Sequence, residues 1–144
     1  MNGVYIVVRI EKKKPISIAS RKQKARVLQQ WVCKKISELT GMKWGKDCPI
    51  ESRPMGQSGV DVRLDKDALL EFPFSVECKF QESWNVHSWV KQARSNKIKG
   101  TNWLLIAKRS RGKPVVIMDA EAFFDLLTDI SLAYPFINEG DNNE

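Results

Sequence analysis

The chain has 144 residues, of which 42% are hydrophobic, and carries a formal net charge of +7. This length suits one domain that buries an apolar core without disulfides or a structural metal. The basic excess is N-terminal, because residues 1–60 hold 13 Lys and Arg against 4 Asp and Glu, whereas residues 61–144 hold 11 against 13. Clustered positive charge is typical of proteins that bind a phosphate backbone, although ribosomal, membrane-surface and merely soluble basic proteins share it.

Cysteine, histidine and hydropathy patterns exclude several other classes. Cys33, Cys48 and Cys78 are odd in number and lack CxxC spacing, so a disulfide framework is not expected. His87 is the single histidine, which argues against a zinc site or a histidine-dependent nuclease motif. No segment approaches the roughly 20 apolar residues of a membrane span, and the start does not have the form of a secretory signal. We therefore expect a cytoplasmic protein with no membrane partner.

The first strong element along the chain is a helix. Before it, residues 4–10 are β-branched but residues 11–15 add charge and a proline, so residues 1–19 are expected to form an edge strand or a loose arm. Ser20 and Gln23 have the spacing of a capping box, and Gly41 provides the stop. Apolar residues recur between them at helical intervals: Leu28, Trp31, Val32, Ile36 and Leu39.

Two strands with a tight connection are expected next. Residues 48–53 are a candidate first core strand, and the glycines in residues 55–59 mark the connection. Residues 60–64 alternate as a half-buried strand does, which places Asp61 and Arg63 on the face opposite the aliphatic side chains.

A third strand repeats this alternation. Residues 65–73 are polar enough for a loop with one helical turn. Residues 74–80 then alternate, with Glu77 and Lys79 on one side of the strand. The inward side is formed by Phe74, Val76, Cys78 and Phe80. Asp61 and Glu77 can therefore face one another across neighbouring strands.

The remaining pattern predicts a helix, two strands and a last helix. Ser83 is the expected cap of an amphipathic helix that closes near Gly100, with Val86, Trp89, Val90 and Ala93 on its apolar face. Residues 102–108 and 114–118 are apolar strands joined by a basic turn. Asp119 can cap the last helix, whose apolar residues are Phe123, Phe124, Leu126, Leu127 and Ile130.

This order of elements predicts an α/β fold with a mixed central sheet flanked by helices. The expected division is an N-terminal strand or arm over residues 1–19, one domain over residues 20–132, and an acidic tail over residues 133–144 that is too poor in apolar residues to fold.

Asp61, Glu77 and Lys79 form the constellation that carries chemistry. An ExK tripeptide alone is weak evidence, because Glu11-Lys12-Lys13 has the same spelling without an acidic partner on a preceding strand. The copy at Glu77 lies in an apolar strand, where unpaired ions are costly. The two carboxylates could bind Mg²⁺ together with the Cys78 carbonyl, while Lys79 holds or deprotonates the attacking water and offsets charge on the phosphate. A cross-strand ion pair on a solvated face is an equally weighted alternative.

The motifs resemble the PD-(D/E)xK nuclease superfamily: Gly59-Val60-Asp61, a gap, and Val76-Glu77-Cys78-Lys79 after a basic helix. More narrowly, Leu28-Gln29-Gln30-Trp31-Val32, Ser52-Arg53-Pro54-Met55-Gly56 and Gln92-Ala93 are similar to segments of small phage proteins classed as endonucleases. The resemblance implies a restriction-endonuclease-like αβββαβ core.

The same resemblance implies the activity and its residues. Asp61 and Glu77 would be metal ligands, Lys79 the catalytic lysine, and Gln92 a residue near the site, although a neutral polar residue at a helix–sheet boundary is as good an interpretation of Gln92. Mg²⁺ would be the cofactor, with Mn²⁺ as a substitute, and DNA the substrate. A homodimer in the host cytoplasm, acting in phage replication, recombination or packaging, is expected by analogy. Val60 departs from the family's proline, and Gln29 and Gln30 stand where some resolvases have a metal-proximal glutamate.

Several residues are candidates for contact with DNA. Ser52, Arg53 and Ser58 precede the Asp61 strand and could contact the scissile phosphate, or they could simply form a turn. The other candidates are basic residues of the first helix and of the turn after residue 108: Lys22, Arg26, Arg109 and Arg111. Trp84 could stack on an unpaired base. A non-catalytic DNA-binding protein and a homing or restriction endonuclease are the rival functions.

Overall fold

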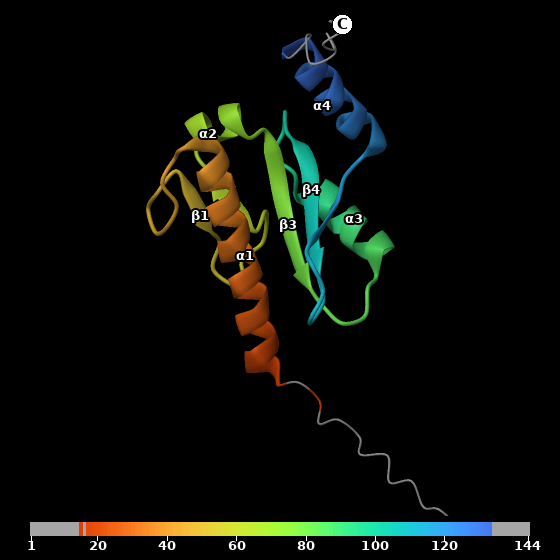
Figure 1. The fold of residues 1–144 in the computed structure, drawn as a ribbon. Helices are drawn as coiled ribbons and strands as arrows, with labels where there is room; N and C mark the ends of the chain where they lie inside the picture. Colours follow the sequence, from red (N-terminus) through yellow and green to blue (C-terminus); the bar gives the residue numbers. More distant parts are fainter. Residues whose placement is uncertain (1–14, 16, 134–144) are drawn as a thin grey trace, which may run out of the picture.

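The computed structural model describes residue 15 and residues 17–133 (Figure 1), so most of the expected arm and nearly all of the expected tail lie outside the described residues. The elements follow in the order α1 (Ile18–Thr40), β1 (Ile50–Ser52), β2 (Val62–Leu64), α2 (Lys66–Glu71), β3 (Phe74–Phe80), α3 (Val86–Asn96), β4 (Asn102–Lys108), β5 (Val115–Ile117) and α4 (Ala120–Ala133). The expected αβββαβ order is present, with α2 in the polar insert. None of the described helices is long and apolar enough to cross a membrane.

Helix ends show where local patterns were misleading. The N-cap of α1 is Ser17, whose hydroxyl accepts a hydrogen bond from the Ser20 N–H at 3.2 Å, so the expected cap at Ser20 was wrong by one turn. The predicted stop at Gly41 is confirmed, since this glycine adopts a left-handed conformation with φ of 73°. Helix α3 is capped by Asn85 rather than by Ser83, because the Asn85 side chain accepts the Ser88 N–H.

The strands form a mixed arrangement. Strand β4 pairs in parallel with β3, from Phe74 opposite Asn102 to Phe80 opposite Lys108, and β5 pairs antiparallel with β4. Strands β1 and β2 form an antiparallel pair. A hydrogen bond of 2.9 Å from the Asp61 N–H to the Val76 carbonyl joins the start of β2 to β3. The predicted α/β class with a mixed sheet is confirmed.

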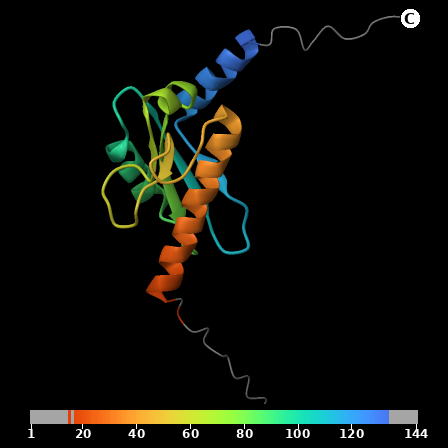
Figure 2. The same cartoon turned by 90° about the vertical axis from the view of Figure 1, so that its left-hand side faces the viewer.

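Helices cover both faces of β3 and β4, as Figures 1 and 2 show. Helix α1 packs with Val76, Cys78, Leu104 and Ile106 in one apolar cluster. Helix α3 packs through Trp89 and Ala93 on Trp103, Leu105 and Ala107 in a second cluster. Because successive strand residues point to opposite faces, Glu77 points toward the α3 side. Glu77 is buried there, at 3% exposure, and does not lie on a solvated face.

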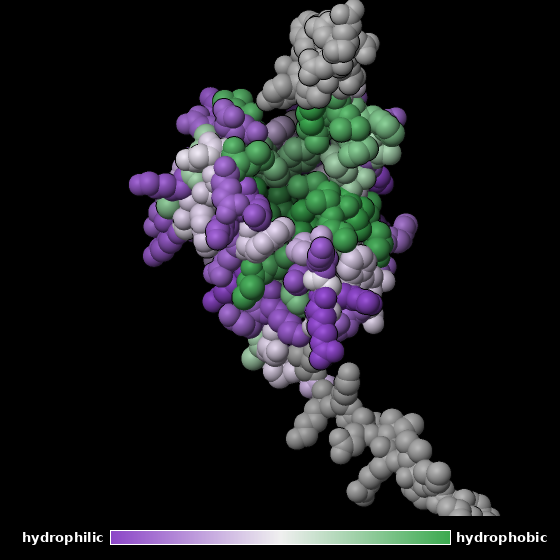
Figure 3. All heavy atoms as spheres, viewed as in Figure 1, coloured by the Kyte–Doolittle hydropathy of each residue, from purple (hydrophilic) through white to green (hydrophobic). Residues whose placement is uncertain are grey.

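The C-terminal helix α4 has the predicted apolar residues but leaves them exposed. Phe123, Phe124 and Ile130 have exposed fractions of 44%, 64% and 49%. Asp119 directly precedes α4 as expected, and its backbone carbonyl accepts the Phe123 N–H at 3.1 Å. Its carboxylate accepts from the Trp103 indole at 2.7 Å and pairs with Arg94. Figure 3 shows hydrophobic side chains gathered on the face beside α1 and continuing to α4.

Candidate active site

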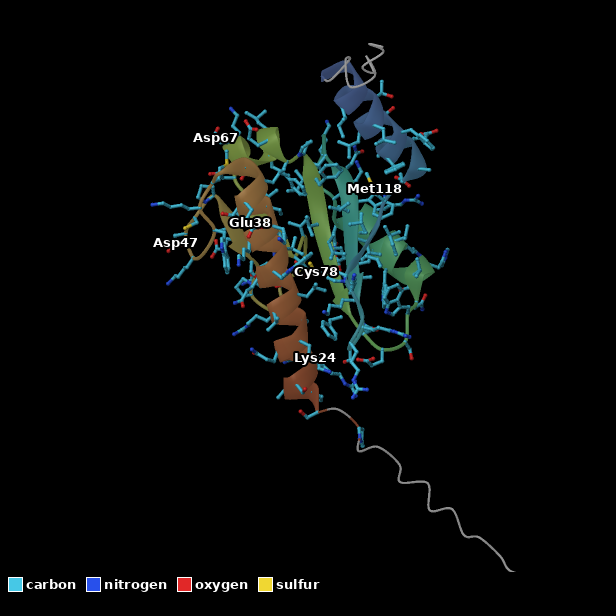
Figure 4. The ribbon with its side chains drawn as sticks, in the orientation of Figure 1. Lys24, Glu38, Asp47, Asp67, Cys78 and Met118 are labelled. Atoms are coloured by element: carbon cyan, nitrogen blue, oxygen red, sulfur yellow. The ribbon has the colours of Figure 1, made fainter. Side chains whose placement is uncertain are left out.

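A cavity of about 670 Å³ opens between α1, the start of β2, the C-terminal half of β3, and α3. The strands contribute Asp61, Glu77 and Lys79 to its lining, and α3 contributes Gln92. The α1 wall is basic and polar, with Arg21, Lys22, Lys24 and Gln29. The four residues predicted to act in catalysis therefore share one cavity. In Figure 4, Cys78 marks its strand side and Lys24 its α1 side.

Asp61 is fixed against the edge of β3 by its backbone and its side chain. Its N–H donates to the Val76 carbonyl, and its own carbonyl accepts the Arg53 N–H at 2.8 Å. The carboxylate oxygen Oδ2 accepts the Cys78 N–H at 2.6 Å. Val76 and Cys78 flank Glu77 in β3, so these bonds place the Asp61 carboxylate beside the second acid, Glu77.

Glu77 is held by one residue of its own strand and one of α3. The Lys79 ammonium lies 2.9 Å from Glu77 Oε1. The Asn96 amide donates to Glu77 Oε2 and to the Gly59 carbonyl, both at 3.3 Å. Lys79 also donates to the Gln92 side-chain oxygen at 2.8 Å. The carboxylate and the ammonium are thus fixed relative to each other and to α3.

The surroundings of Asp61 disfavour the charged form of its carboxyl group. Burial, and next the Glu77 carboxylate, raise the pKa of Asp61 from 3.8 to about 6, against the opposing effects of the Cys78 N–H, Lys79 and Arg53. Burial also raises the pKa of the Cys78 thiol well above its usual range, and that of Cys33 to about 12. The Cys78 thiol therefore stays protonated and packs in the core.

The donor set fits a hard divalent cation of the magnesium type. Across the part of the chain that is described, no three His, Cys, Asp or Glu side chains gather in a way that could hold a metal ion. Mg²⁺ does not need such a cage, because it usually keeps several waters and binds through one or two carboxylates plus substrate phosphate. Asp61 and Glu77 provide those carboxylates, and their mutual repulsion would be relieved by a cation between them.

The predicted phosphate contacts next to β2 are already bonded within the protein. The Ser52 hydroxyl donates to Gln29 Oε1 at 2.9 Å, and the Arg53 guanidinium donates to the Ser58 carbonyl. Arg53 also lies directly under Gly59, where a Cβ would come within 2.8 Å of its Nη1. These contacts shape the connection before Asp61, and a role in holding phosphate stays a prediction.

The four predicted basic residues lie in four different places. Lys22 lines the cavity, whereas Arg26 is exposed one turn later on α1 and is not part of the lining. Arg109 lines a second cavity, which adjoins the first one. Arg111 is exposed at the turn between β4 and β5, with a positive φ of 61°.

Sequence patterns did not identify Asn96 or Lys24. Asn96 follows Gln92 by four residues, so helical spacing places it on the same face of α3, one turn farther along. That signal was present, but nothing in the sequence singled out an asparagine at a helix end. Lys24 lines the cavity and donates to the Ser110 hydroxyl at 2.9 Å, a contact between residues 86 positions apart that no local pattern predicts.

A mixed α/β sheet that places an aspartate beside a Glu-x-Lys strand is the arrangement that defines PD-(D/E)xK nucleases. Residues 20–140 match the family model described as "Phage putative PDDEXK endonuclease", and the chain belongs to this family. No curated protein and no solved structure gave a significant match. The family name indicates an endonuclease of phage origin and implies DNA as its substrate.

Proposed function

We propose that the protein is a magnesium-dependent endodeoxyribonuclease, in which Asp61 and Glu77 hold the ion and Lys79 acts on the reacting phosphate. The observation that carries the proposal is the shared cavity: two acids, one of them with a raised pKa, lie beside a fixed lysine and below a basic helix. A buried acid pair is costly for folding, so its presence in a cleft indicates a binding or catalytic task.

The ligands would be the carboxylates of Asp61 and Glu77 and the backbone carbonyl of Cys78. When bound, Mg²⁺ would polarise a phosphate oxygen and favour ionisation of a water molecule, and Mn²⁺ should replace it. Asn96 would hold Glu77 in the orientation that this set requires, through its bond to Oε2.

Lys79 would act on the reacting phosphate, and Gln92 would position Lys79. Hydrolysis forms a bond from a water oxygen to phosphorus and breaks a phosphorus–oxygen ester bond, while the water loses a proton to the solvent and the leaving oxygen gains one from it. The Lys79 ammonium, positioned by Glu77 and Gln92, would stabilise the negative charge that grows on the phosphate oxygens. Gln92 would orient the lysine and is exposed enough to reach the substrate.

The DNA backbone would lie along the basic wall of the cavity. Lys22 and Lys24 line this wall, and Arg26 and Arg111 extend the positive charge beyond it. The proposal includes a structure-selective or nicking activity in phage DNA replication, recombination or packaging, in the cytoplasm of the host cell.

The proposal also includes a homodimer. Helix α4 exposes Phe123, Phe124 and Leu127, and an apolar depression of about 210 Å³ between α1 and β5 is bordered by Trp31 and Val116. A group of exposed apolar side chains beside an apolar depression is typical of an interaction surface. Helix α4 also carries Glu121, Asp125 and Asp129, so an anionic lipid surface or DNA is a poor partner for it.

The test of nuclease function is cleavage of supercoiled plasmid with Mg²⁺, with Mn²⁺ or with EDTA. The parent protein should cut with either metal and not with EDTA. Asp61→Asn and Glu77→Gln should lose at least about a hundredfold in rate, because each removes a charge that holds the ion. Their affinity for DNA in EDTA should stay equal or improve, since a negative charge is removed.

Asp67→Asn is the matched control, because Asp67 lies on α2 and does not line the cavity. In Figure 4 it lies apart from Cys78 and Lys24, which do. It should cut like the parent protein. Full activity of the Asp61 and Glu77 variants, or a parent protein that binds DNA but cuts with neither metal, would contradict the proposal. The second result would instead favour the non-catalytic DNA-binding function.

A further inference from the structure

A second cavity of about 420 Å³ adjoins the first one. It is lined by Trp84, Glu82, Arg109, Gly112 and Lys113, from the loop between β3 and α3 and from the turn between β4 and β5. Glu82 lines both cavities, so the two share a wall. We call the second cavity the Trp84 pocket.

Trp84 is held in place although much of its ring is open. Its exposed fraction is 39%, whereas the neighbouring Trp89 is 5% exposed. The Trp84 indole N–H donates to the Gln81 carbonyl at 3.0 Å, and its ring lies against Trp89 at 5.9 Å between centroids with a 55° tilt. Because the indole polar group is satisfied and the ring is supported, what remains available is aromatic surface. An aromatic surface of this kind binds another flat ring by stacking.

The other walls of the pocket carry charges of both signs. Arg109 and Lys113 are exposed cations that can contact a phosphate on either side of a stacked ring. The Glu82 carboxylate accepts the Ser110 N–H at 3.1 Å, and the Ser110 hydroxyl accepts from Lys24. An acid at this position disfavours a phosphate inside the pocket but can accept a hydrogen bond from the amino group of a nucleobase.

We propose that the Trp84 pocket binds an unpaired nucleobase of the DNA strand whose backbone lies in the neighbouring cavity. This inference rests on the proposed nuclease function and names its substrate class, which is DNA with an unpaired base close to the scissile phosphate. In continuous duplex DNA each base is stacked and paired, and extraction of a base costs several kcal/mol. A single-stranded flank provides a base to Trp84 without that cost, so the pocket favours flaps, bulges or junctions over plain duplex.

The test measures binding in EDTA, so that it does not depend on cleavage. Labelled duplex DNA and a duplex of equal length with a short single-stranded flap are titrated with the parent protein, Trp84→Ala and Trp84→Phe. Trp84→Ala should weaken flap binding about tenfold, the usual loss for one stacked base, and change duplex binding less than about twofold. Trp84→Phe should retain most of the flap affinity, because an aromatic ring remains.

Trp44→Ala is the matched control, since Trp44 has the same exposed fraction of 39% and lies between α1 and β1. It should bind both DNAs like the parent protein. A flap with abasic residues gives a further test that needs no variant: it should bind the parent protein about tenfold more weakly than the normal flap, and Trp84→Ala should not distinguish the two flaps.

Equal affinity of the parent protein for normal and abasic flaps would overturn the base-binding inference, as would equal losses of Trp84→Ala on flap and duplex. Failure of the nuclease function gives a different result. In that case the parent protein would cut no DNA with Mg²⁺ or Mn²⁺, while the preference for an unpaired base in EDTA would still be measured.

Discussion

Asp61 is a proposed metal ligand, and the charge on its buried carboxylate also destabilises the folded protein. Its pKa of about 6, against an ordinary value of 3.8, arises from burial and from the Glu77 carboxylate. Between these two values the folded protein holds a proton on Asp61 that the unfolded chain has lost. The folded state therefore loses stability as the pH rises through this window, by roughly 3 kcal/mol in total.

Asp61→Asn removes this pH dependence, because the amide has no proton to lose and its oxygen can still accept the Cys78 N–H. In EDTA, we expect the variant to be more stable than the parent protein by roughly 2–3 kcal/mol at pH 8, and nearly equal to it below pH 4. Urea unfolding at a series of pH values measures the difference. Parallel curves for the two proteins between pH 4 and pH 7 would show that Asp61 is not strained by its surroundings.

Asn96 orients Glu77 and should affect the metal more than the chemical step. Asn96→Ala removes the bond to Glu77 Oε2, so we expect the Mn²⁺ concentration for half-maximal cleavage to rise about tenfold, as is usual when a group that supports a ligand is lost. The rate at saturating Mn²⁺ should change much less. Asn102→Ala, at the exposed start of β4, is the control. If excess Mn²⁺ did not restore the rate of Asn96→Ala, Asn96 would support the overall structure and not the metal site.

At the scale of elements, α1 joins the core to the basic wall. Its buried side packs on β3 through Val32 and Ile36, and its N-terminal turns bring Lys22 and Lys24 to the cavity. Each lysine that contacts a DNA phosphate contributes about 0.9 to the slope of log Kd against log salt. Lys22→Gln should therefore lower this slope by roughly 1 and weaken binding at low salt. Lys66→Gln, on α2, should leave the slope unchanged.

The slopes are compared by measuring the affinity of the parent protein and of both variants for DNA at salt concentrations from about 50 to about 300 mM. An unchanged slope for Lys22→Gln would place the DNA on another surface of the protein. Lys24→Gln is informative in addition, because Lys24 also binds Ser110 and so holds the turn between β4 and β5 against α1.

Alternation within short strands was enough to predict which residues share a face, but not what covers it. Val62 and Leu64 are buried and Arg63 is exposed, as the pattern of residues 60–64 predicts. The same pattern in residues 74–80 placed Glu77 opposite the apolar side chains, but it left open whether that face is solvated or covered. Strand β3 instead pairs in parallel with β4, and parallel strands are usually covered on both faces. The cover is α3, whose position depends on packing between distant segments.

Polar residues on that covered face are why the burial could not be predicted. Ser75 and Glu77 are 3% exposed, yet they have the residue types of a solvated face. Their burial is possible because partners from elsewhere satisfy them: Thr101 bonds Ser75 at 2.7 Å, and Asn96 bonds Glu77. Such partners become visible only when the chain is folded, and the same is true of the Ser52–Gln29 bond across α1 and β1.

At the scale of the whole molecule, a monomer does not explain why α4 exposes apolar side chains. The sequence predicted this helix correctly, but the described part of the protein leaves Phe124 at 64% exposure. A homodimer through α4 and the neighbouring apolar face would cover it. Phe124→Asp should then shift the protein toward monomer in sedimentation experiments, because a buried charge without a partner opposes association.

Leu70→Asp is the control for this substitution, since Leu70 is 75% exposed on α2 and does not border the apolar depression. It should leave the dimer intact. A stable dimer should persist at protein concentrations of tens of micromolar. A parent protein that is monomeric at such concentrations would contradict the proposed homodimer.

The most direct test of the metal site is Mn²⁺ binding, followed by calorimetry and by electron paramagnetic resonance, with DNA that carries a non-hydrolysable linkage. The parent protein should bind Mn²⁺ with release of a proton near pH 6, since Asp61 must ionise. Asp61→Asn and Glu77→Gln should each abolish this binding, and Asp67→Asn should retain it. Equal Mn²⁺ affinity in all four proteins would mean that residues 61 and 77 do not hold the ion.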